Sequence, residues 1–163
     1  EQARSAGQSG LANPGVLMFH DMERRDLTRP LAVLLFVRNA GGEVLAISRK
    51  EDHTQFGLIG GKVDPEDGPV DPDQLVETLC RAVIREVREE IGVELRREDL
   101  VGVLHHPDEY GYWNFCFGVH DGVEVDAATQ EGEGVTTWVD WDVLVNGPFK
   151  EFNTALRAHV TGA

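Results

Sequence analysis

Apolar residues recur along the chain with two different periods, and the shorter period predicts strands. Residues 31–37 (LAVLLFV) are continuously apolar and too short for a typical helix, which predicts a strand buried on both faces. Residues 43–49 (EVLAISR) follow a turn signal and alternate between apolar and polar positions, which predicts a second strand. The other predicted strands are residues 56–63, interrupted by Gly60 and Gly61, and residues 100–104, 112–119 and 135–139.

A helical period begins after the turn-rich residues 64–72. Asp71 is suited to cap a helix, Pro72 to its first position and Gln74 to a capping box. Apolar residues then recur at helical spacing and form one face, at Leu75, Leu79, Ala82, Val83, Val87 and Ile91. Gly92 is a natural end for this helix, and residues 154–160 predict a second one.

Strands that surround one long helix, with another helix at the end, predict an α/β fold. We expect an α/β/α sandwich in which a mixed β-sheet lies between helices. The 163 residues suffice for one domain with a sizeable core, which we place at residues 16–163. Residues 1–15 are expected to form a flexible N-terminus, and residues 1–10 lack the apolar segment of a signal peptide.

Composition and charge narrow the classes of partner. No apolar run reaches the roughly 20 residues of a membrane span, so we expect no membrane partner. The 15 Lys and Arg residues against 29 Asp and Glu residues give a net charge of −14, which opposes binding to nucleic acid. A small phosphorylated ligand is still compatible, because a divalent cation can bridge carboxylates to phosphates. Cys80 and Cys116 lie among apolar neighbours, which predicts buried free thiols and a cytoplasmic protein.

Three glutamates in the long helix are the first candidates for chemistry. Glu86 and Glu90 are four residues apart on one helix face, about 5–6 Å apart at their Cβ atoms, and Glu89 flanks them. Their charges repel one another, and a hard cation such as Mg²⁺ or Mn²⁺ would offset that repulsion. The alternative interpretation is an ordinary solvated face on which arginines pair with these glutamates.

Together with the preceding glycines and acidic turn, this helix resembles the Nudix family of MutT-like hydrolases. The family box reads G-x5-E-x7-R-E-U-x-E-E-x-G-U, where U is aliphatic. Its second half matches at every position between Glu77 and Val93. The resemblance also takes in the strands within residues 31–49, the GGKV at residues 60–63 and the strand that contains Trp138, so it covers roughly residues 30–160.

The first half of the box departs from the family pattern. The first Gly should lie six residues before the Glu, yet Gly61 lies sixteen residues before Glu77. The residue six positions after Gly61 is Asp67. Relative to the family pattern, about ten residues are therefore inserted between Asp67 and Glu77. If the helix is continuous from Pro72, Glu77 and Arg85 are about 12 Å apart along its axis, which would strain their usual ion pair. Asp67 and Glu77 are therefore both candidates for the first acidic position of the box.

The resemblance implies an enzyme that hydrolyses phosphoanhydrides with the help of a divalent cation. Glu86, Glu89 and Glu90 would hold Mg²⁺ or Mn²⁺, with help from the carbonyl of Gly60. One of these glutamates, or a more distant one, would act as general base towards water. The catalytic residues implied by the box are Glu89, Glu86, Arg85 and Glu77.

Family members often draw a further carboxylate from a loop that precedes a late strand containing Trp. Glu131 and Glu133 both precede Trp138 here, and we assign Glu131 as the additional metal ligand with Glu133 as its alternative. A polar hairpin tip is the competing interpretation of both residues.

Residues outside the box would determine the substrate. Asn153 resembles the asparagine with which MutT-like enzymes read a purine base, and a helix N-cap is its alternative. Arg49 is expected to reach phosphates, with a solvated strand end as the alternative. The expected lining of a base-stacking cleft consists of Leu58, Tyr112, Trp113 and Phe117. Trp113 could equally lie in the core, and we prefer the core for Phe117.

These expectations combine into a small-molecule nucleotide substrate. Our first choice is a nucleoside triphosphate, with an oxidised purine nucleotide included. The alternatives are ADP-ribose or a dinucleoside polyphosphate, and a catalytically idle module that senses a nucleotide. The intact glutamate set argues against the idle module, because a retired site should lose some of these mutually repelling charges. The sequence leaves a homodimer, the favoured metal and the attacked phosphorus open.

Overall fold

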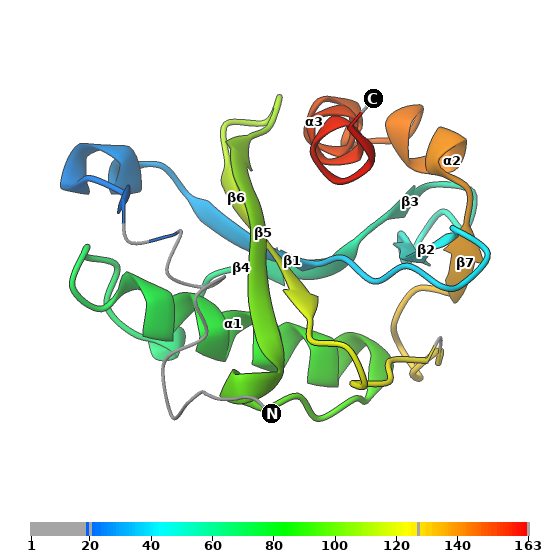
Figure 1. Cartoon of the computed structure of the whole chain (residues 1–163), viewed down its shortest axis with the longest axis horizontal. Coiled ribbons are helices and arrows are strands. Elements are labelled where there is room, and N and C mark those ends of the chain that lie inside the picture. The colour runs from blue at the N-terminus through cyan, green and yellow to red at the C-terminus, as the bar shows by residue number, and fades with distance from the viewer. Residues whose placement is uncertain (1–18, 20, 127, 163) are drawn as a thin grey trace.

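The computed structural model describes residues 19, 21–126 and 128–162, and it contains two β-sheets with helices on both sides (Figure 1). The first sheet has the strand order β4-β1-β6-β5 and the second has the order β3-β2-β7. The strands of the first sheet are β1 (Leu31–Leu35), β4 (Ile59–Lys62), β5 (Leu100–Pro107) and β6 (Trp113–Val119). Those of the second sheet are β2 (Val44–Ser48), β3 (Phe56–Gly57) and β7 (Thr136–Val139).

The first sheet is mixed, as predicted. β1 runs parallel to β6 and antiparallel to β4, while β5 and β6 form an antiparallel pair with an irregular register between Gly102 and Leu104. All pairings in the second sheet are antiparallel. The α/β fold is therefore confirmed, and the predicted mixed sheet proves to be the four-stranded one, with the other three strands forming a second sheet.

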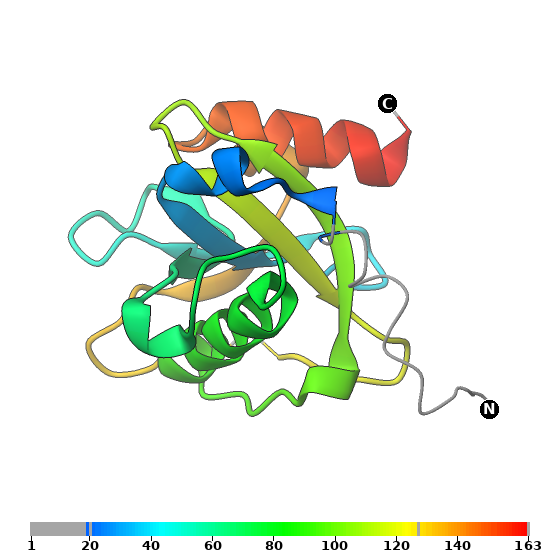
Figure 2. The ribbon, with the colours of Figure 1, turned by 90° about the vertical axis from the view of Figure 1, so that its left-hand side faces the viewer.

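Three α-helices and several short 3₁₀ turns complete the described chain. The helices are α1 (Leu75–Ile91), α2 (Trp141–Val145) and α3 (Lys150–Thr161), and the 3₁₀ turns include η2 (Arg24–Thr28), η3 (Pro65–Asp67) and η4 (Arg97–Asp99). α1 packs against β1 and β4, whereas α3 packs against β5 on the opposite side of the sheet (Figures 1 and 2). α2 was not predicted, because its five residues are too few to show a helical period.

The long helix begins three residues later than the capping signals predict. The Oδ1 atom of Asp71 accepts hydrogen bonds from the backbone N–H groups of Asp73 and Gln74, so the side chain stabilises a turn that precedes the helix. α1 therefore starts at Leu75. It ends as predicted at Gly92, which has a φ of 71° and donates its N–H to the carbonyl of Arg88.

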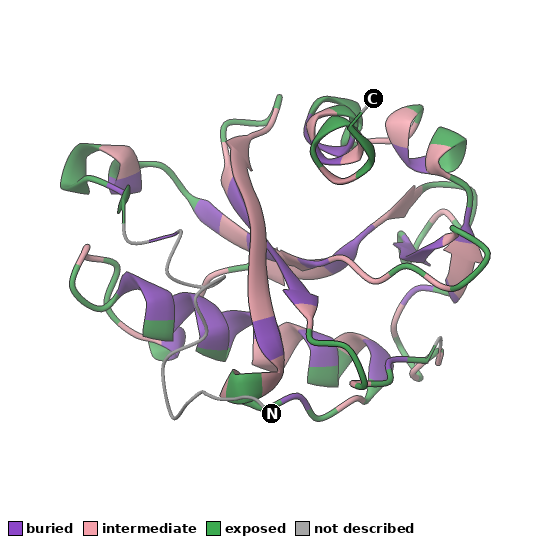
Figure 3. Cartoon of the chain, in the orientation of Figure 1, coloured by how far each residue is buried: buried purple, intermediate pink, exposed green. Residues whose placement is uncertain are grey.

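The core lies on both sides of the first sheet. The apolar face of α1 packs on one side, so that this helix is buried toward the sheet and exposed outward (Figure 3). Phe152 and Leu156 of α3 pack on the other side with residues of β2 and with Cys116. Cys80 and Cys116 are both buried free thiols, as predicted.

Two expectations concern the ends of the chain and membranes. The predicted flexible N-terminus, residues 1–15, lies outside the described residues. Within the described residues, every helix is too short or too polar to cross a bilayer.

Candidate active site

The paired glycines of β4 lie directly against the glutamates of α1. The backbone N–H of Gly60 donates a 2.9 Å hydrogen bond to Oε1 of Glu90. A Cβ atom at Gly61 would collide with the carboxylate of Glu86, so the missing side chain lets the helix carboxylates approach the strand. The sequence separates these residues by about 30 positions, and the packing of α1 on β4 brings them together.

Arg85 is the centre of the hydrogen-bond network at this site. Its guanidinium donates two hydrogen bonds of 2.9 Å to the carboxylate of Asp67, in the bidentate geometry that makes such pairs strong. The Nη1 atom of Arg85 donates to Oε1 of Glu86 at 2.8 Å and to Oε1 of Glu89 at 3.2 Å. Asp67 is only 4% exposed, so Arg85 ties the residue that directly precedes the inserted segment to the glutamates through a largely buried contact.

Glu77, which we predicted for the catalytic set, lies apart from the other residues of that set. Glu77 points away from Arg85 and receives a 2.8 Å hydrogen bond from Nε of Arg97 on the exposed surface. Asp67 takes the position beside Arg85, because η3 ends at this residue directly after β4. The count from Gly61 is thus the relevant spacing, and the segment that follows Asp67 is an outward insertion.

Side chains of α1 fasten that insertion to the helix. The hydroxyl of Thr78, which is fully buried, donates a 2.7 Å hydrogen bond to the carbonyl of Pro69. Nη1 of Arg81 donates to the carbonyl of Asp67 at 3.0 Å. Gly68 lies between these contacts, and a Cβ atom there would collide with the side chain of Thr78. The insertion is therefore packed tightly enough to hold Asp67 in place.

Burial and mutual repulsion disfavour the charged forms of the glutamates. Burial raises the pKa of Glu90 to about 8, the charges of Glu86 and Glu133 add to this rise, and the hydrogen bond from Gly60 opposes it. Burial also raises the pKa of Glu86, although hydrogen bonding to Arg85 works in the opposite direction. A bound cation would reduce the repulsion between these carboxylates and favour their charged forms.

The carboxylates suit a divalent cation, because such a cation prefers oxygen ligands and each carboxylate has an oxygen that accepts no hydrogen bond from the described residues. Glu86, Glu89 and Glu90 each use Oε1 for the hydrogen bonds described above. No described residue donates to their Oε2 atoms, so each side chain keeps one oxygen for a metal. Within the described residues, no group of three ligand-type side chains is already gathered closely enough to hold an ion.

Glu133, rather than Glu131, is the more distant carboxylate at this site. A depression beside β2 is lined by Glu90, Glu133, Arg49 and Lys50, and Nζ of Lys50 lies 3.6 Å from the carboxylate of Glu133. Glu131 is exposed and does not line the depression. Of the two candidates, Glu133 is therefore the one that lies near Glu90, and its role as a metal ligand stays a prediction.

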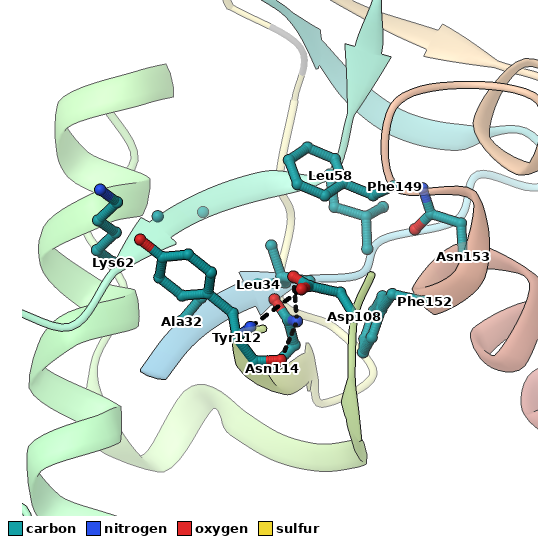
Figure 4. A pocket seen from close by; sticks show the side chains of 12 residues that line it. Ala32, Leu34, Leu58, Lys62, Asp108, Tyr112, Asn114, Phe149, Phe152 and Asn153 are labelled. Carbon is teal, nitrogen blue, oxygen red and sulfur yellow. Dashed lines mark hydrogen bonds between the residues drawn. The ribbon is translucent and has the colours of Figure 1, made fainter. Parts of the chain in front are cut away.

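A mainly apolar pocket shares Gly60 and Gly61 with the carboxylate site. It has a volume of about 250 Å³, slightly below the usual range for small-molecule sites. Leu58, Tyr112 and Asn153 all line it, and Figure 4 shows that they come from separate segments of the chain. The structure thus brings together three of the four predicted substrate-binding residues. Arg49 is on the far side of the site, in the depression with Glu90.

Two aromatic residues that were considered for the pocket, and one alternative for Asn153, have different outcomes. Phe117 is fully buried in the core, as we preferred, and Trp113 packs against the core with the guanidinium of Arg29 5.0 Å from its ring centroid. Asn153 is not a helix N-cap, because Phe149 holds that position and Asn153 lies inside α3. The N-cap alternative is therefore wrong.

The lining residues that were not predicted from the sequence include Asp108, Asn114 and Phe149. Asp108 lies in the turn between β5 and β6, and Asn114 is a buried polar residue within β6. An asparagine in the otherwise apolar run WNFCF is unusual for a core strand, and this signal could have identified it. Phe149 carries no comparable signal.

Comparisons with known proteins agree with this arrangement. A family model described as the NUDIX domain matches residues 28–159. No curated protein matches the chain.

Solved structures similar to this chain include several from the same family. A MutT protein from a study of Aliivibrio salmonicida and Vibrio cholerae is 21% identical, with 82% of this chain and 98% of that chain covered and a TM-score of 0.55. A MutT NUDIX hydrolase from Burkholderia pseudomallei is 24% identical over 80% and 97% of the two chains, with a TM-score of 0.52. The dihydroneopterin triphosphate pyrophosphohydrolase of E. coli is 17% identical over 82% and 96%, with a TM-score of 0.55. At these identities the likeness concerns the fold.

Proposed function

Because the chain belongs to the Nudix family of pyrophosphohydrolases, we propose that it hydrolyses a phosphoanhydride bond in a nucleoside diphosphate derivative. A nucleoside triphosphate is the preferred substrate in this proposal. The observation that carries it is the junction at Gly60 and Gly61, where a cluster of acidic side chains and an apolar pocket meet on one strand. A base in the pocket would direct its phosphates towards the carboxylates.

The glutamates of α1 are the proposed ligands of Mg²⁺ or Mn²⁺. Glu86, Glu89 and Glu90 would each contribute the oxygen that accepts no hydrogen bond from the described chain, and the carbonyl of Gly60 would help. Glu133 faces Glu90 and could complete the acidic surroundings. A divalent cation, when bound, neutralises phosphate charge and lowers the pKa of the attacking water.

The protein residues around this centre have distinct proposed roles. Glu89 is the best placed general base, because its side chain is 53% exposed and can reach a water molecule that the more buried Glu86 cannot. Arg85 positions Glu86 and Glu89, and Asp67 in turn holds Arg85. Arg49 lies beside Glu90, where its charge would attract the phosphates.

A panel of nucleotides tests this proposal directly. Nucleoside triphosphates, ADP-ribose and a dinucleoside polyphosphate are each incubated with the protein and Mg²⁺ or Mn²⁺, and the release of pyrophosphate, phosphate or AMP is measured. We expect turnover of at least one triphosphate. Turnover confined to ADP-ribose or to dinucleoside polyphosphates would overturn the proposed substrate, and no turnover of any compound would overturn the proposed activity.

Two substitutions then test the assignment of residues. Glu89→Gln and Glu90→Gln should each lower kcat by about a hundredfold or more, because a missing general base or metal ligand removes an interaction needed in the transition state. Glu94→Gln is the matched control, since this glutamate lies past the end of α1 with its side chain 69% exposed. Unchanged turnover in both site variants would refute the assignment.

A further inference from the structure

The loop that carries Glu133, residues 130–135, is fastened to the end of β2, just before β7 pairs with that strand (Figure 1). The backbone N–H of Ser48 donates to the carbonyl of Val135 at 2.9 Å, and the N–H of Val135 donates to Oγ of Ser48 at 2.8 Å. A Cβ atom at Gly134 would collide with the carbonyl oxygen of Ser48, so this close approach requires glycine. The backbone next to Glu133 therefore has little freedom to move.

Lys50 follows the same end of β2 and forms an ion pair with Glu133. Its Nζ atom lies 3.6 Å from Oε2 of Glu133. Among the described residues, no other Lys or Arg side chain comes within ion-pair distance of this carboxylate. The side chain of Lys50 is 61% exposed and that of Glu133 is 22% exposed. Because exposed ion pairs contribute little free energy, the lysine can turn into solvent while the carboxylate stays in place.

Both members of this ion pair act on Glu90, which lines the same depression. Burial is the main cause of the raised pKa of Glu90, the charge of Glu133 raises this pKa further, and the charge of Lys50 lowers it. Lys50 thus offsets part of the repulsion between the two glutamates. A divalent cation that Glu133 helps to bind would meet the ammonium group already paired with that carboxylate, and the two positive charges would repel each other.

We propose that Lys50 is an internal counterion that competes with the divalent cation for Glu133 and thereby sets the metal affinity of the site. This inference rests on the proposed function, because it concerns the metal site named there. Without metal, the ammonium group neutralises Glu133. A bound cation displaces the ammonium group into solvent, so the affinity for the cation is lower than the carboxylates alone would give. Lys50 is therefore a positioning residue that acts through Glu133.

The affinity for Mn²⁺ alone, without nucleotide, tests this proposal. The dissociation constant is obtained by titrating the whole protein and measuring the EPR signal of free Mn²⁺. We expect Lys50→Met to bind Mn²⁺ about fivefold or more tightly than wild type, because the competing charge is gone. Lys50→Arg keeps the charge and should bind like wild type. A substitution that merely damaged the loop would weaken binding, so the direction of the change separates the two explanations.

Lys150→Met is the matched control for net charge. This lysine is exposed at the start of α3, on the side of the sheet opposite α1, and the substitution removes the same charge. Its Mn²⁺ affinity should differ from that of wild type by less than about twofold, because solvent and salt screen distant charges. Equal gains in Lys50→Met and Lys150→Met would overturn the proposal, as would unchanged or weaker binding in Lys50→Met.

A double-mutant cycle tests whether Lys50 acts through Glu133. In the Glu133→Gln background the competed carboxylate is absent, so Lys50→Met should change the Mn²⁺ dissociation constant by less than about twofold. A gain as large as in the wild-type background would overturn the assigned route. If the double variant fails to fold, the comparison of Lys50→Met with Lys150→Met still decides the inference.

The binding and turnover measurements separate this inference from the proposed function. Hydrolysis of a triphosphate together with equal Mn²⁺ affinities of wild type and Lys50→Met would overturn the inference and leave the proposed function standing. Tighter binding by Lys50→Met without turnover of any nucleotide would do the reverse. Absence of Mn²⁺ binding in both proteins would overturn the inference whatever the turnover.

Discussion

At the scale of single residues, the site depends on how Arg85 divides its hydrogen bonds. One guanidinium contacts Asp67, which directly precedes the insertion, and Glu86 and Glu89 on the helix. The two glutamates are thereby held when no cation neutralises them. This arrangement combines the two interpretations that the sequence left open, since the same glutamates pair with an arginine and retain oxygens for a metal.

Asp67→Asn tests the role of Asp67 beside Arg85. Replacing the charged acceptor should lower the free energy of unfolding by about 2 kcal/mol, the usual value for a hydrogen bond to a charged group. Turnover should fall as well, because Arg85 no longer holds the glutamates. Glu77→Gln, on the exposed side of α1, should change stability by less than about 0.5 kcal/mol and leave turnover unaltered. Equal losses in both variants would contradict the structural assignment.

The stability difference between wild type and Asp67→Asn should also depend on pH. Burial acts to raise the pKa of Asp67, but the hydrogen bonds from Arg85 and from the backbone of Asp64 outweigh it, so the pKa is lowered in the folded protein. A lowered folded pKa stabilises the protein above the unfolded value of about 3.9, and this contribution is lost as pH falls through the folded pKa. Urea unfolding at pH 7 and pH 3.5 should therefore give a smaller difference at the lower pH.

The sequence predicts a residue of the site well where its position follows from its near neighbours in the chain, and poorly where it depends on distant segments. Helical spacing alone predicts that Glu86, Glu89 and Glu90 lie close together, whereas their assignment to a metal also required the resemblance to the family box. Asp67 and Glu133 could only be named as alternatives, since their choice depends on how a loop folds back onto α1 or β2. Asp108 could not be predicted, because its role comes from the conformation of one turn.

At the scale of elements, the inserted segment shows how the chain can carry extra residues before α1 while the carboxylate site on that helix is kept. The chain leaves β4, turns through η3 to place Asp67, and then loops out before α1 begins at Leu75. The strands could be predicted from alternation and apolar runs, whereas their division into two sheets depends on long-range pairing, such as that of β2 with β7. Capping signals misplaced the start of α1 because Asp71 stabilises a turn equally well.

Thr78→Val tests whether the insertion is fastened to α1 by the Thr78 hydroxyl. The substitution keeps the shape of the side chain but removes the donor to the carbonyl of Pro69, so the free energy of unfolding should fall by about 1 kcal/mol. Turnover should fall if the loosened insertion also lets Asp67 move. Thr154→Val on the exposed side of α3 is the control for the change in residue type. An unfolding midpoint and m-value unchanged from wild type would show that the contact contributes nothing.

At the scale of the whole molecule, the proposed site lies where separate parts of the fold converge. Helix α1 and β4 supply the carboxylates and glycines, the turn between β5 and β6 supplies Asp108, and α3 supplies Asn153. The turn also contacts the segment before α3, where the hydroxyl of Tyr110 donates to the carbonyl of Pro148 at 2.5 Å. A pocket assembled from segments this far apart in the chain leaves no periodic signal in the sequence.

The net charge of −14 gives a prediction that belongs to the whole molecule. Excess negative charge destabilises a compact fold by self-repulsion, so raising NaCl from about 20 to 300 mM should raise Tm through screening. Mg²⁺ at matched ionic strength should raise Tm further and then saturate, because binding at a site stabilises the folded state according to ligand concentration. The two effects separate in Glu86→Gln, which should keep the response to NaCl and lose most of the additional response to Mg²⁺. Equal responses of wild type and variant to Mg²⁺ would mean that the cation acts only on the general charge, and the glutamates of α1 would then have no special affinity for it.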